Sequence, residues 1–144
     1  MDKKYDALKL ENQLCFPLYV CAKEVVRRYT PLLNELDLTY TQYIAMMALW
    51  ENKEINVKRL GELLCLDSGT LTPLLKKLEA KGYVTRQRAR ADEREVIITL
   101  TPSGDKLKDK ALSVPKQIGS CIALSPDEAV QLHRILHKLI DSFE

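Results

Sequence analysis

Hydrophobic positions recur with a helical period over much of the 144-residue chain. Residues 8–30 form the first such stretch, and Pro17 interrupts it. A second stretch runs from Thr39 to Trp50, where Thr39 and Gln42 have the spacing of a capping box. The pattern therefore predicts two amphipathic helices in the first third of the chain.

The middle of the chain predicts a helix, a tight turn and a second helix. In INVKRLGELLCL, the residues expected to face inward are Leu60, Leu63 and Leu64. The segment DSGT at 67–70 then breaks this helix and offers N-cap residues for LTPLLKKLEAKG. We expect the second helix to start near Thr70, because Pro73 would then lie in the first turn, where backbone N–H groups have no intrahelical partner.

After Gly82, which has the position of a helix-ending glycine, the period changes from helix to strand. Two β-prone runs, 83–86 and 96–100, flank the polar stretch QRARADERE and predict a hairpin. Helical periodicity returns after TPSG at 101–104, and SPDE marks the start of a last amphipathic helix over 129–143. We expect a mainly α fold with a small β-hairpin wing, which is the winged helix-turn-helix arrangement.

Charge is distributed unevenly along this predicted fold. The formal net charge is +2, but the segment from Lys76 to Arg94 carries seven Lys or Arg and three acidic residues, which leaves the remainder slightly acidic. A local basic excess is typical of a surface that neutralises DNA phosphates. A solvated helix face followed by a charged loop would give the same composition, so charge alone leaves both interpretations open.

Composition also bears on the compartment. The start of the chain mixes both charge signs without an apolar signal core, and the longest apolar run, YIAMMALW, is too short to span a bilayer. We therefore expect a cytoplasmic, single-domain protein. The cysteines, which form no C-x-x-C pair and are expected to stay reduced, are Cys15, Cys21, Cys65 and Cys121. Cys65 lies in apolar LGELLCL and is interpreted as a packing residue.

The helix-turn-helix and wing carry a family resemblance. LDSGTLTPLLKKLEAKGYVTR, followed by the pattern D-x-R-x5-L-T, resembles the MarR family of dimeric bacterial transcription regulators, and the likeness extends over essentially the whole chain. The segment LENQLCF-x-LY is similar to the organic-hydroperoxide-sensing branch, OhrR. The resemblance implies a winged core of about 38–101 and a homodimer formed through helices of about 8–36 and 102–144.

The same resemblance implies a mechanism and places a sensor. The reduced protein would repress transcription at a pseudo-palindromic operator in double-stranded DNA and would leave it after an organic hydroperoxide oxidises Cys15. Tyr29 and Tyr40 are carried over as hydrogen-bond donors to the oxidisable sulfur, from the opposite subunit, with Tyr19 as a third candidate. Cys121 is either a thiol that resolves a sulfenic acid at Cys15 into an inter-subunit disulfide or an incidental thiol. For Cys15 and Cys21, the competing interpretation is that both are small core residues.

The expected DNA contacts lie at the start of the second helix and on the wing. Small polar side chains at a helix N-terminus can approach base edges in a major groove, whereas wing arginines suit phosphates and a narrow minor groove. The predicted contacts are Ser68, Thr70, Thr72, Lys76, Lys77, Arg86, Arg88, Arg90 and Arg94. Asp92 would repel phosphate, so we expect it to orient an arginine at the hairpin tip.

Three other interpretations compete with this one. His133 and His137 have metal-ligand spacing but lack a convincing set of further ligands, so we expect surface or interface histidines, no metal and no cofactor. A repressor of the same fold controlled by a phenolic or apolar effector in the dimer cleft remains open. A thiol peroxidase with Cys15 as nucleophile would leave the basic hairpin unexplained, and no His or Arg is evidently placed to activate a peroxide. We therefore do not expect an enzyme.

Overall fold

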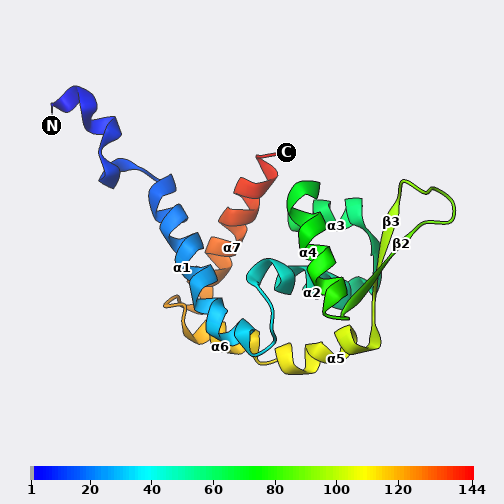
Figure 1. Ribbon diagram of the computed structural model, residues 1–144. Helices are drawn as coiled ribbons and strands as arrows, with labels where there is room; N and C mark the ends of the chain where they lie inside the picture. The colour runs from blue at the N-terminus through cyan, green and yellow to red at the C-terminus, as the bar shows by residue number, and fades with distance from the viewer. Residues whose placement is uncertain (1) are drawn as a thin grey trace. The chain divides into compact units, whose positions relative to one another are not determined.

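A computed structural model describes residues 2–144 of the protein (Figure 1). Two short 3-10 helices, Lys3–Leu8 and Leu10–Asn12, precede the first α-helix. The further elements are α1 (Cys15–Asn34), α2 (Tyr40–Asn52), β1 (Glu54–Asn56), α3 (Val57–Leu64), α4 (Ser68–Ala80), β2 (Val84–Arg88), β3 (Val96–Leu100), α5 (Pro102–Ala111), α6 (Val114–Ser120) and α7 (Pro126–Asp141). The chain divides into two compact units, Met1–Val114 and Pro115–Glu144, and each is described by itself.

Helix α1 starts later than the hydrophobic pattern predicts. It begins at Cys15, not near residue 8, and continues to Asn34. Pro17 is therefore the third helical residue, and its missing N–H breaks no intrahelical hydrogen bond because first-turn N–H groups have no such partner. The proline that looked like an interruption lies in the first turn of the helix.

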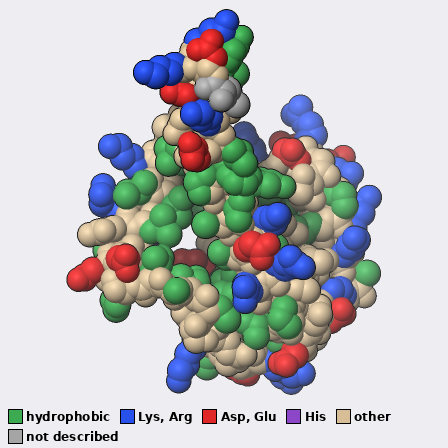
Figure 2. Space-filling model, turned by 90° about the vertical axis from the view of Figure 1, so that its left-hand side faces the viewer, with side chains coloured by type: hydrophobic (Ala, Val, Ile, Leu, Met, Phe, Trp, Pro, Cys, Tyr) green, Lys and Arg blue, Asp and Glu red, His purple; other side chains and the backbone are tan. Residues whose placement is uncertain are grey.

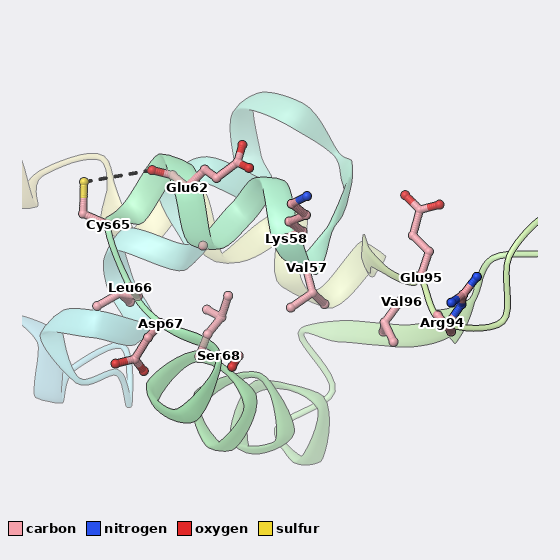
Figure 3. Close-up of a pocket in the computed structure, with 12 residues that line it drawn as sticks. Val57, Lys58, Glu62, Cys65, Leu66, Asp67, Ser68, Arg94, Glu95 and Val96 are labelled. Carbon is pink, nitrogen blue, oxygen red and sulfur yellow. Dashed lines mark hydrogen bonds between the residues drawn. The ribbon is translucent and has the colours of Figure 1, made fainter. Parts of the chain in front are cut away.

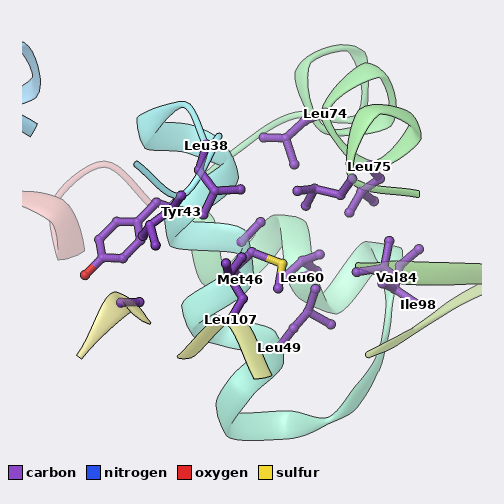
Figure 4. Close-up of a cluster of buried hydrophobic side chains, with 14 of the residues drawn as sticks. Leu38, Tyr43, Met46, Leu49, Leu60, Leu74, Leu75, Val84, Ile98 and Leu107 are labelled. Carbon is purple, nitrogen blue, oxygen red and sulfur yellow. The ribbon is translucent and has the colours of Figure 1, made fainter. Parts of the chain in front are cut away.

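Helix α2 lies in the middle of the hydrophobic core. Its predicted capping box is confirmed, because the Thr39 hydroxyl accepts a hydrogen bond from the Gln42 N–H (3.3 Å) and the Gln42 Oε1 accepts one from the Thr39 N–H (3.1 Å). Tyr43, Met46 and Leu49 are at most 3% exposed. They belong to one core cluster with leucines of α3 and α4 and with Val84 and Ile98 of the sheet (Figure 4).

The helix-turn-helix is present, with two differences from the prediction. Asp67 caps α4 by accepting the Thr70 N–H at 2.8 Å, so the helix starts at Ser68 rather than Thr70. Pro73 consequently lies beyond the first turn and removes one helical hydrogen bond. Among the leucines of α3, Leu60 is fully buried and Leu64 half-buried, but the prediction for Leu63 was wrong, because it is 43% exposed.

The wing belongs to a sheet of three antiparallel strands. The predicted hairpin is confirmed as β2 and β3, with Val84 opposite Leu100 and Arg88 opposite Val96. Sequence analysis missed β1, which pairs with the other edge of β3 and gives the order β1-β3-β2. Gly82 ends α4 as predicted, with a positive φ of 80° that suits glycine. Figure 1 shows the loop between β2 and β3 projecting past α3 and α4.

Helix α5 is held against the sheet and α2 by its first turn. Thr101 caps it by accepting the Gly104 N–H (3.0 Å), and the indole N–H of Trp50 donates to the Gly104 carbonyl (2.9 Å). Gly104 also lies close to the backbone of Tyr83, because a Cβ on Gly104 would stand 2.2 Å from the Tyr83 carbonyl oxygen. This position therefore requires glycine.

The second unit contains most of α6 and the amphipathic α7. The predicted start signal of α7 is confirmed, since Ser125 and Glu128 form a capping box with bonds of 3.2 and 3.0 Å. The backbone N–H of Ser125 lowers the pKa of Glu128. Apolar residues of α7 that are at least 38% exposed are Val130, Leu132, Ile135, Leu139 and Ile140. Within residues 2–144, no helix has the length and apolar character needed to cross a membrane.

We expect Gly104→Ala to lower the free energy of unfolding by about 2 kcal/mol or more, because a backbone carbonyl cannot move aside for the added methyl group. Gly69→Ala is a matched control, since its Cβ would meet Asp67 Oδ1 at 3.5 Å, an ordinary contact. Urea unfolding followed by circular dichroism measures both changes. Equal stability of Gly104→Ala and wild type would contradict the close approach.

Candidate nucleic-acid interface and thiol site

Helix α4 presents polar and basic side chains at the surface. Ser68 and Thr70 are exposed and Thr72 is half-buried, and Lys76 and Lys77 are exposed further along the helix. A helix N-terminus with small hydroxyl side chains can approach base edges, and its free N–H groups can bind a phosphate. The predicted base-reading and backbone-binding residues of α4 therefore share one helix, in that order along it.

Asp67 fixes the first turn of this helix. The hydrogen bond from the Thr70 N–H stabilises the carboxylate and lowers the pKa of Asp67. Because the folded-state pKa is lowered, the stabilisation from this cap is present at neutral pH and is lost as the pH falls through the folded value.

The wing arginines differ in how closely their guanidinium groups interact with other groups of the same chain. The Arg94 side chain is 94% exposed, its backbone N–H donates to Asp92 Oδ1 (3.0 Å), and its Nε lies 3.5 Å from the same oxygen. Asp92 thus contacts a tip arginine, as expected. Arg90 is exposed, and Arg88 Nη1 donates to the Glu93 carbonyl at 2.6 Å.

Arg86 is engaged within the chain. Its Nε lies 3.4 Å from Glu79 Oε1, and its backbone N–H donates to Glu79 Oε2 at 3.2 Å. Its side chain is only 28% exposed. Among the predicted DNA contacts, Arg86 therefore connects β2 to α4 through its interactions with Glu79.

A pocket of about 640 Å³ opens between the helix-turn-helix and the base of the wing (Figure 3). Apolar residues from α3, α4 and β3 line it, and so do charged residues of both signs, which are Lys58, Glu62, Asp67, Arg94 and Glu95. Lys58 is an exposed cation beside the predicted interface that sequence reasoning missed, because it precedes the basic segment that begins at Lys76. Its position as the second residue of α3, in the first helix of the helix-turn-helix, was the feature of the sequence that could have indicated it.

Cys65 also lines this pocket, so the prediction that it packs in the core was wrong. It ends α3 in the left-handed conformation, with φ of 54°. This backbone conformation directs the chain into the turn and leaves the side chain exposed, with Sγ 4.0 Å from the Glu62 carbonyl oxygen.

Three tyrosines gather where α1 meets α2. The ring of Tyr29 lies 4.9 Å from that of Tyr40 and 5.8 Å from that of Tyr43, measured between centroids. Burial, and then the neighbouring phenols, raise the pKa of Tyr29, and burial followed by Tyr40 does the same for Tyr43. Tyr29 and Tyr43 therefore keep their protons at neutral pH and can donate hydrogen bonds.

Sequence reasoning did not include Tyr43 in this cluster. It is 3% exposed, stacks edge-on to Trp50, and lies three residues after Tyr40 on the same face of α2. That spacing was a usable signal. Figure 4 shows its hydroxyl directed away from Leu60.

Cys15 is an exposed thiol at the first residue of α1. No side chain caps this helix, so its first-turn N–H groups have no side-chain acceptor. Tyr29 lies 14 positions further along the same helix, which is about 21 Å at 1.5 Å per residue. The structure therefore does not bring Tyr29 to Cys15 of the same chain.

The other candidate residues near Cys15 are also exposed. Tyr19, one turn along α1, is 62% exposed, and the Lys23 ammonium lies 5.6 Å from its ring centroid. Cys21 is exposed as well, so neither Cys15 nor Cys21 is a core residue of this chain. Many hydrophobic side chains lie at the surface on the side that carries α1 (Figure 2). Those of α1 include Phe16, Leu18, Val25 and Val26, each at least 37% exposed.

In the second unit, Cys121 is an exposed thiol directly after α6, with Sγ 3.5 Å from the Gln117 carbonyl oxygen. The rings of His133 and His137 lie 4.1 Å apart on α7, and His137 Nδ1 is 3.0 Å from the His133 carbonyl oxygen. Across residues 2–144 there is no group of three or more His, Cys, Asp or Glu side chains that could hold a metal ion.

Comparison with known proteins agrees with this geometry. A family model described as transcriptional regulator SarA/Rot matches residues 27–111. The organic hydroperoxide resistance transcriptional regulator of Bacillus subtilis is 46% identical over 99% of this chain and 97% of its own.

Solved structures of AbfR, a Staphylococcus epidermidis protein, have the same fold. Reduced AbfR bound to DNA is 34% identical, with a TM-score of 0.81, over 97% of this chain and 96% of its own. Overoxidised AbfR bound to DNA is 35% identical, with a TM-score of 0.78, over 98% and 99%. The disulfide-formed AbfR structure is 36% identical, with a TM-score of 0.66, over 95% and 96%.

These matches include the helix-turn-helix, the wing and the terminal helices. The chain belongs to the MarR family of transcriptional regulators, in the branch of the organic hydroperoxide resistance regulators.

Proposed function

We propose that this protein is a DNA-binding transcriptional repressor that senses organic hydroperoxides through oxidation of Cys15 and then leaves its operator. The observation that carries the proposal is the exposed thiol at the start of α1, in a chain with a winged helix-turn-helix and a tyrosine cluster. Similarity to a hydroperoxide resistance regulator favours redox control over control by a phenolic or apolar effector.

DNA binding is supported by the arrangement of α4 and the wing. Helix α4 offers small polar side chains for the major groove, and Arg90 and Arg94 on the exposed hairpin are suited to phosphates or a narrow minor groove. DNA-bound structures of AbfR lend further support. The proposed partner is a pseudo-palindromic operator whose half-sites lie about one helical turn apart.

A homodimer explains both the exposed apolar faces and the distance between thiol and phenols. Exposed hydrophobic residues on α1 and α7 are typical of surfaces that another chain covers. Because about 21 Å of helix separates Cys15 from Tyr29, the phenols would act on Cys15 of the partner subunit. Tyr29 and Tyr40 would then stabilise the oxidised sulfur by donating hydrogen bonds.

The first chemical step is a two-electron oxidation of one sulfur. The Cys15 thiolate attacks the terminal oxygen of the hydroperoxide and the O–O bond breaks, so that Cys15 becomes a sulfenic acid. The leaving alkoxide takes up the proton that the thiol gave up and departs as the alcohol. A helix N-terminus suits the thiolate because its partial positive charge stabilises an anion. Pro17 has no N–H, so the donors of this first turn are those of the neighbouring residues.

The second step would involve Cys121. Its thiolate attacks the sulfenic sulfur of Cys15, the S–S bond forms as the S–O bond breaks, and the leaving hydroxide takes up the proton that Cys121 gave up and departs as water. A disulfide across the dimer would draw the second unit of one subunit toward α1 of the other and rotate the winged domains away from successive major grooves. A disulfide-formed structure of AbfR supports a disulfide as one oxidised state, and because overoxidised AbfR was observed bound to DNA, we assign operator release to the disulfide.

The first test is Arg94→Ala, which should weaken operator binding by about 1–3 kcal/mol and reduce the slope of log affinity against log salt by about 1. Fluorescence anisotropy with a labelled operator at several salt concentrations measures both quantities. Lys110→Ala removes the same charge from α5 and should change the affinity much less. Wild-type affinity of the Arg94 variant would remove this residue from the interface.

The second test compares two thiols on one helix. Cys15→Ser should bind the operator as tightly as wild type but should no longer release it after organic hydroperoxide, because a hydroxyl cannot form a sulfenic acid. Cys21→Ser is the matched control, since Cys21 is equally an exposed thiol of α1, and it should respond like wild type. Release by Cys15→Ser would contradict the sensor assignment and favour effector control.

The third test concerns Cys121. Oxidised wild type should run as a disulfide-linked dimer on a non-reducing gel, whereas Cys121→Ser should stay at monomer size and accumulate sulfenic or overoxidised Cys15. If Cys121→Ser still forms the linked dimer, a different cysteine resolves Cys15. If wild type forms none and still releases DNA, the disulfide step is not needed.

A further inference from the structure

We propose that the hydrogen bond between Asn56 and Glu95 sets the position of the DNA-binding wing relative to the helix-turn-helix. Asn56 is the last residue of β1 and Glu95 lies directly before β3, next to Arg94. The inference rests on the proposed binding of DNA through the wing, and it adds two positioning residues that do not themselves need to touch DNA.

Both ends of the Asn56 amide are in use. Its Oδ1 accepts the Arg59 N–H at 2.7 Å and thereby caps α3, while its Nδ2 donates to Glu95 Oε1 at 2.9 Å. The bond itself is partly buried, so water competes less with it than with one at the surface. The side chain that starts the first helix of the helix-turn-helix therefore also holds the wing.

Backbone pairing between β1 and the wing strand β3 stops at Asn56. The ladder between β1 and β3 ends with Asn56 opposite Ile97, and β1 contributes no backbone partner for Val96 or Glu95. The Asn56 side chain extends the connection by reaching Glu95. Without it, the chain from Glu95 outward would depend on contacts within the hairpin.

The backbone of Glu95 makes two of the hydrogen bonds within the hairpin. Its carbonyl accepts the Ala89 N–H (2.8 Å), which continues the ladder toward β2, and its own N–H donates to the Asp92 carbonyl (3.0 Å). Asp92 in turn binds Arg94. A displacement of the Glu95 backbone would therefore move Asp92 and Arg94 together.

Little packing replaces this bond if it is lost. The pocket of about 640 Å³ lies between α3 and the wing base, and a second hollow of about 280 Å³ is lined by Asn56, Lys58, Asp92, Arg94 and Glu95. Figure 3 shows Lys58 and Val57 on one side and Arg94, Glu95 and Val96 on the other. Because the base of the wing borders these hollows, directed hydrogen bonds rather than packing keep it in place. Without them, DNA binding would have to bear the entropic cost of ordering the wing.

The main experiment is a double-mutant cycle with Asn56→Ser and Glu95→Ala. Serine can still cap α3 but is too short to reach Glu95, and the substitution leaves the charge unchanged. We expect Asn56→Ser to weaken operator binding about fivefold, the size expected for one hydrogen bond, with a shallower salt dependence. In the Glu95→Ala background, the same substitution should cost nothing further.

A reversed pair provides a rescue. In Asn56→Asp combined with Glu95→Gln, the aspartate still caps α3 and the glutamine amide can donate to it, so the bond is restored with donor and acceptor exchanged. This variant has the net charge of wild type, as Asn56→Ser does. Its operator affinity should return to within about twofold of wild type, whereas loss of fold stability alone would show as a lowered unfolding midpoint without this pattern.

The outcomes separate this proposal from the one on which it rests. If Arg94→Ala weakens binding while Asn56→Ser binds like wild type, the positioning role is refuted and the wing keeps its DNA contact. The positioning role is also refuted if Asn56→Ser costs as much in the Glu95→Ala background as in wild type. If Arg94→Ala and Asn56→Ser both bind like wild type, DNA binding through the wing is itself wrong.

Discussion

The packing of α2 is the constraint on which the rest of the winged unit depends. This helix contacts α1, α3, α4, α5, β1 and β3, and its residues Met46 and Leu49 have no exposed surface. Its first turn carries Tyr40 and Tyr43 of the tyrosine cluster, and its last turn carries Trp50, which binds the Gly104 carbonyl. Because a close-packed interior transmits displacement, the region proposed to respond to oxidation and the region proposed to bind DNA share one rigid element.

A polar network joins the start of α2 to the end of α4. Lys81, which follows the last residue of α4, donates to Gln42 Oε1 at 3.1 Å and to the Asp37 carbonyl. Gln42 belongs to the capping box that starts α2, next to Tyr40. The hydrogen bonds of Lys81 therefore connect the start of α2 to the end of α4. The bond between Asn56 and Glu95 connects the start of α3 to the wing.

Features that depend on a few consecutive residues could be predicted from the sequence. The capping boxes, Gly82 and the hairpin were predicted correctly because backbone N–H satisfaction and positive φ are local requirements. Features that depend on distant residues were not. Strand β1 has three residues and exists through its pairing with β3, more than forty positions away. Cys65 looked apolar in sequence, but the left-handed turn that separates α3 from α4 leaves it exposed.

The candidate site shows the same division. The resemblance to the OhrR branch indicated Cys15, Tyr29 and Tyr40, but the inclusion of Tyr43 and the intramolecular pairing of Arg86 follow from tertiary packing. The start of α1 was misjudged because a proline can either break a helix or occupy its first turn, and the flanking pattern of apolar residues continues across both possibilities.

Peptide-resolved mass spectrometry of the operator-bound protein during titration with an organic hydroperoxide tests the central claim most directly. The account predicts that the Cys15 peptide is modified first, by gain of one oxygen or by linkage to the Cys121 peptide, and that operator release follows the linked fraction. Operator release while Cys15 remains a free thiol would contradict the account.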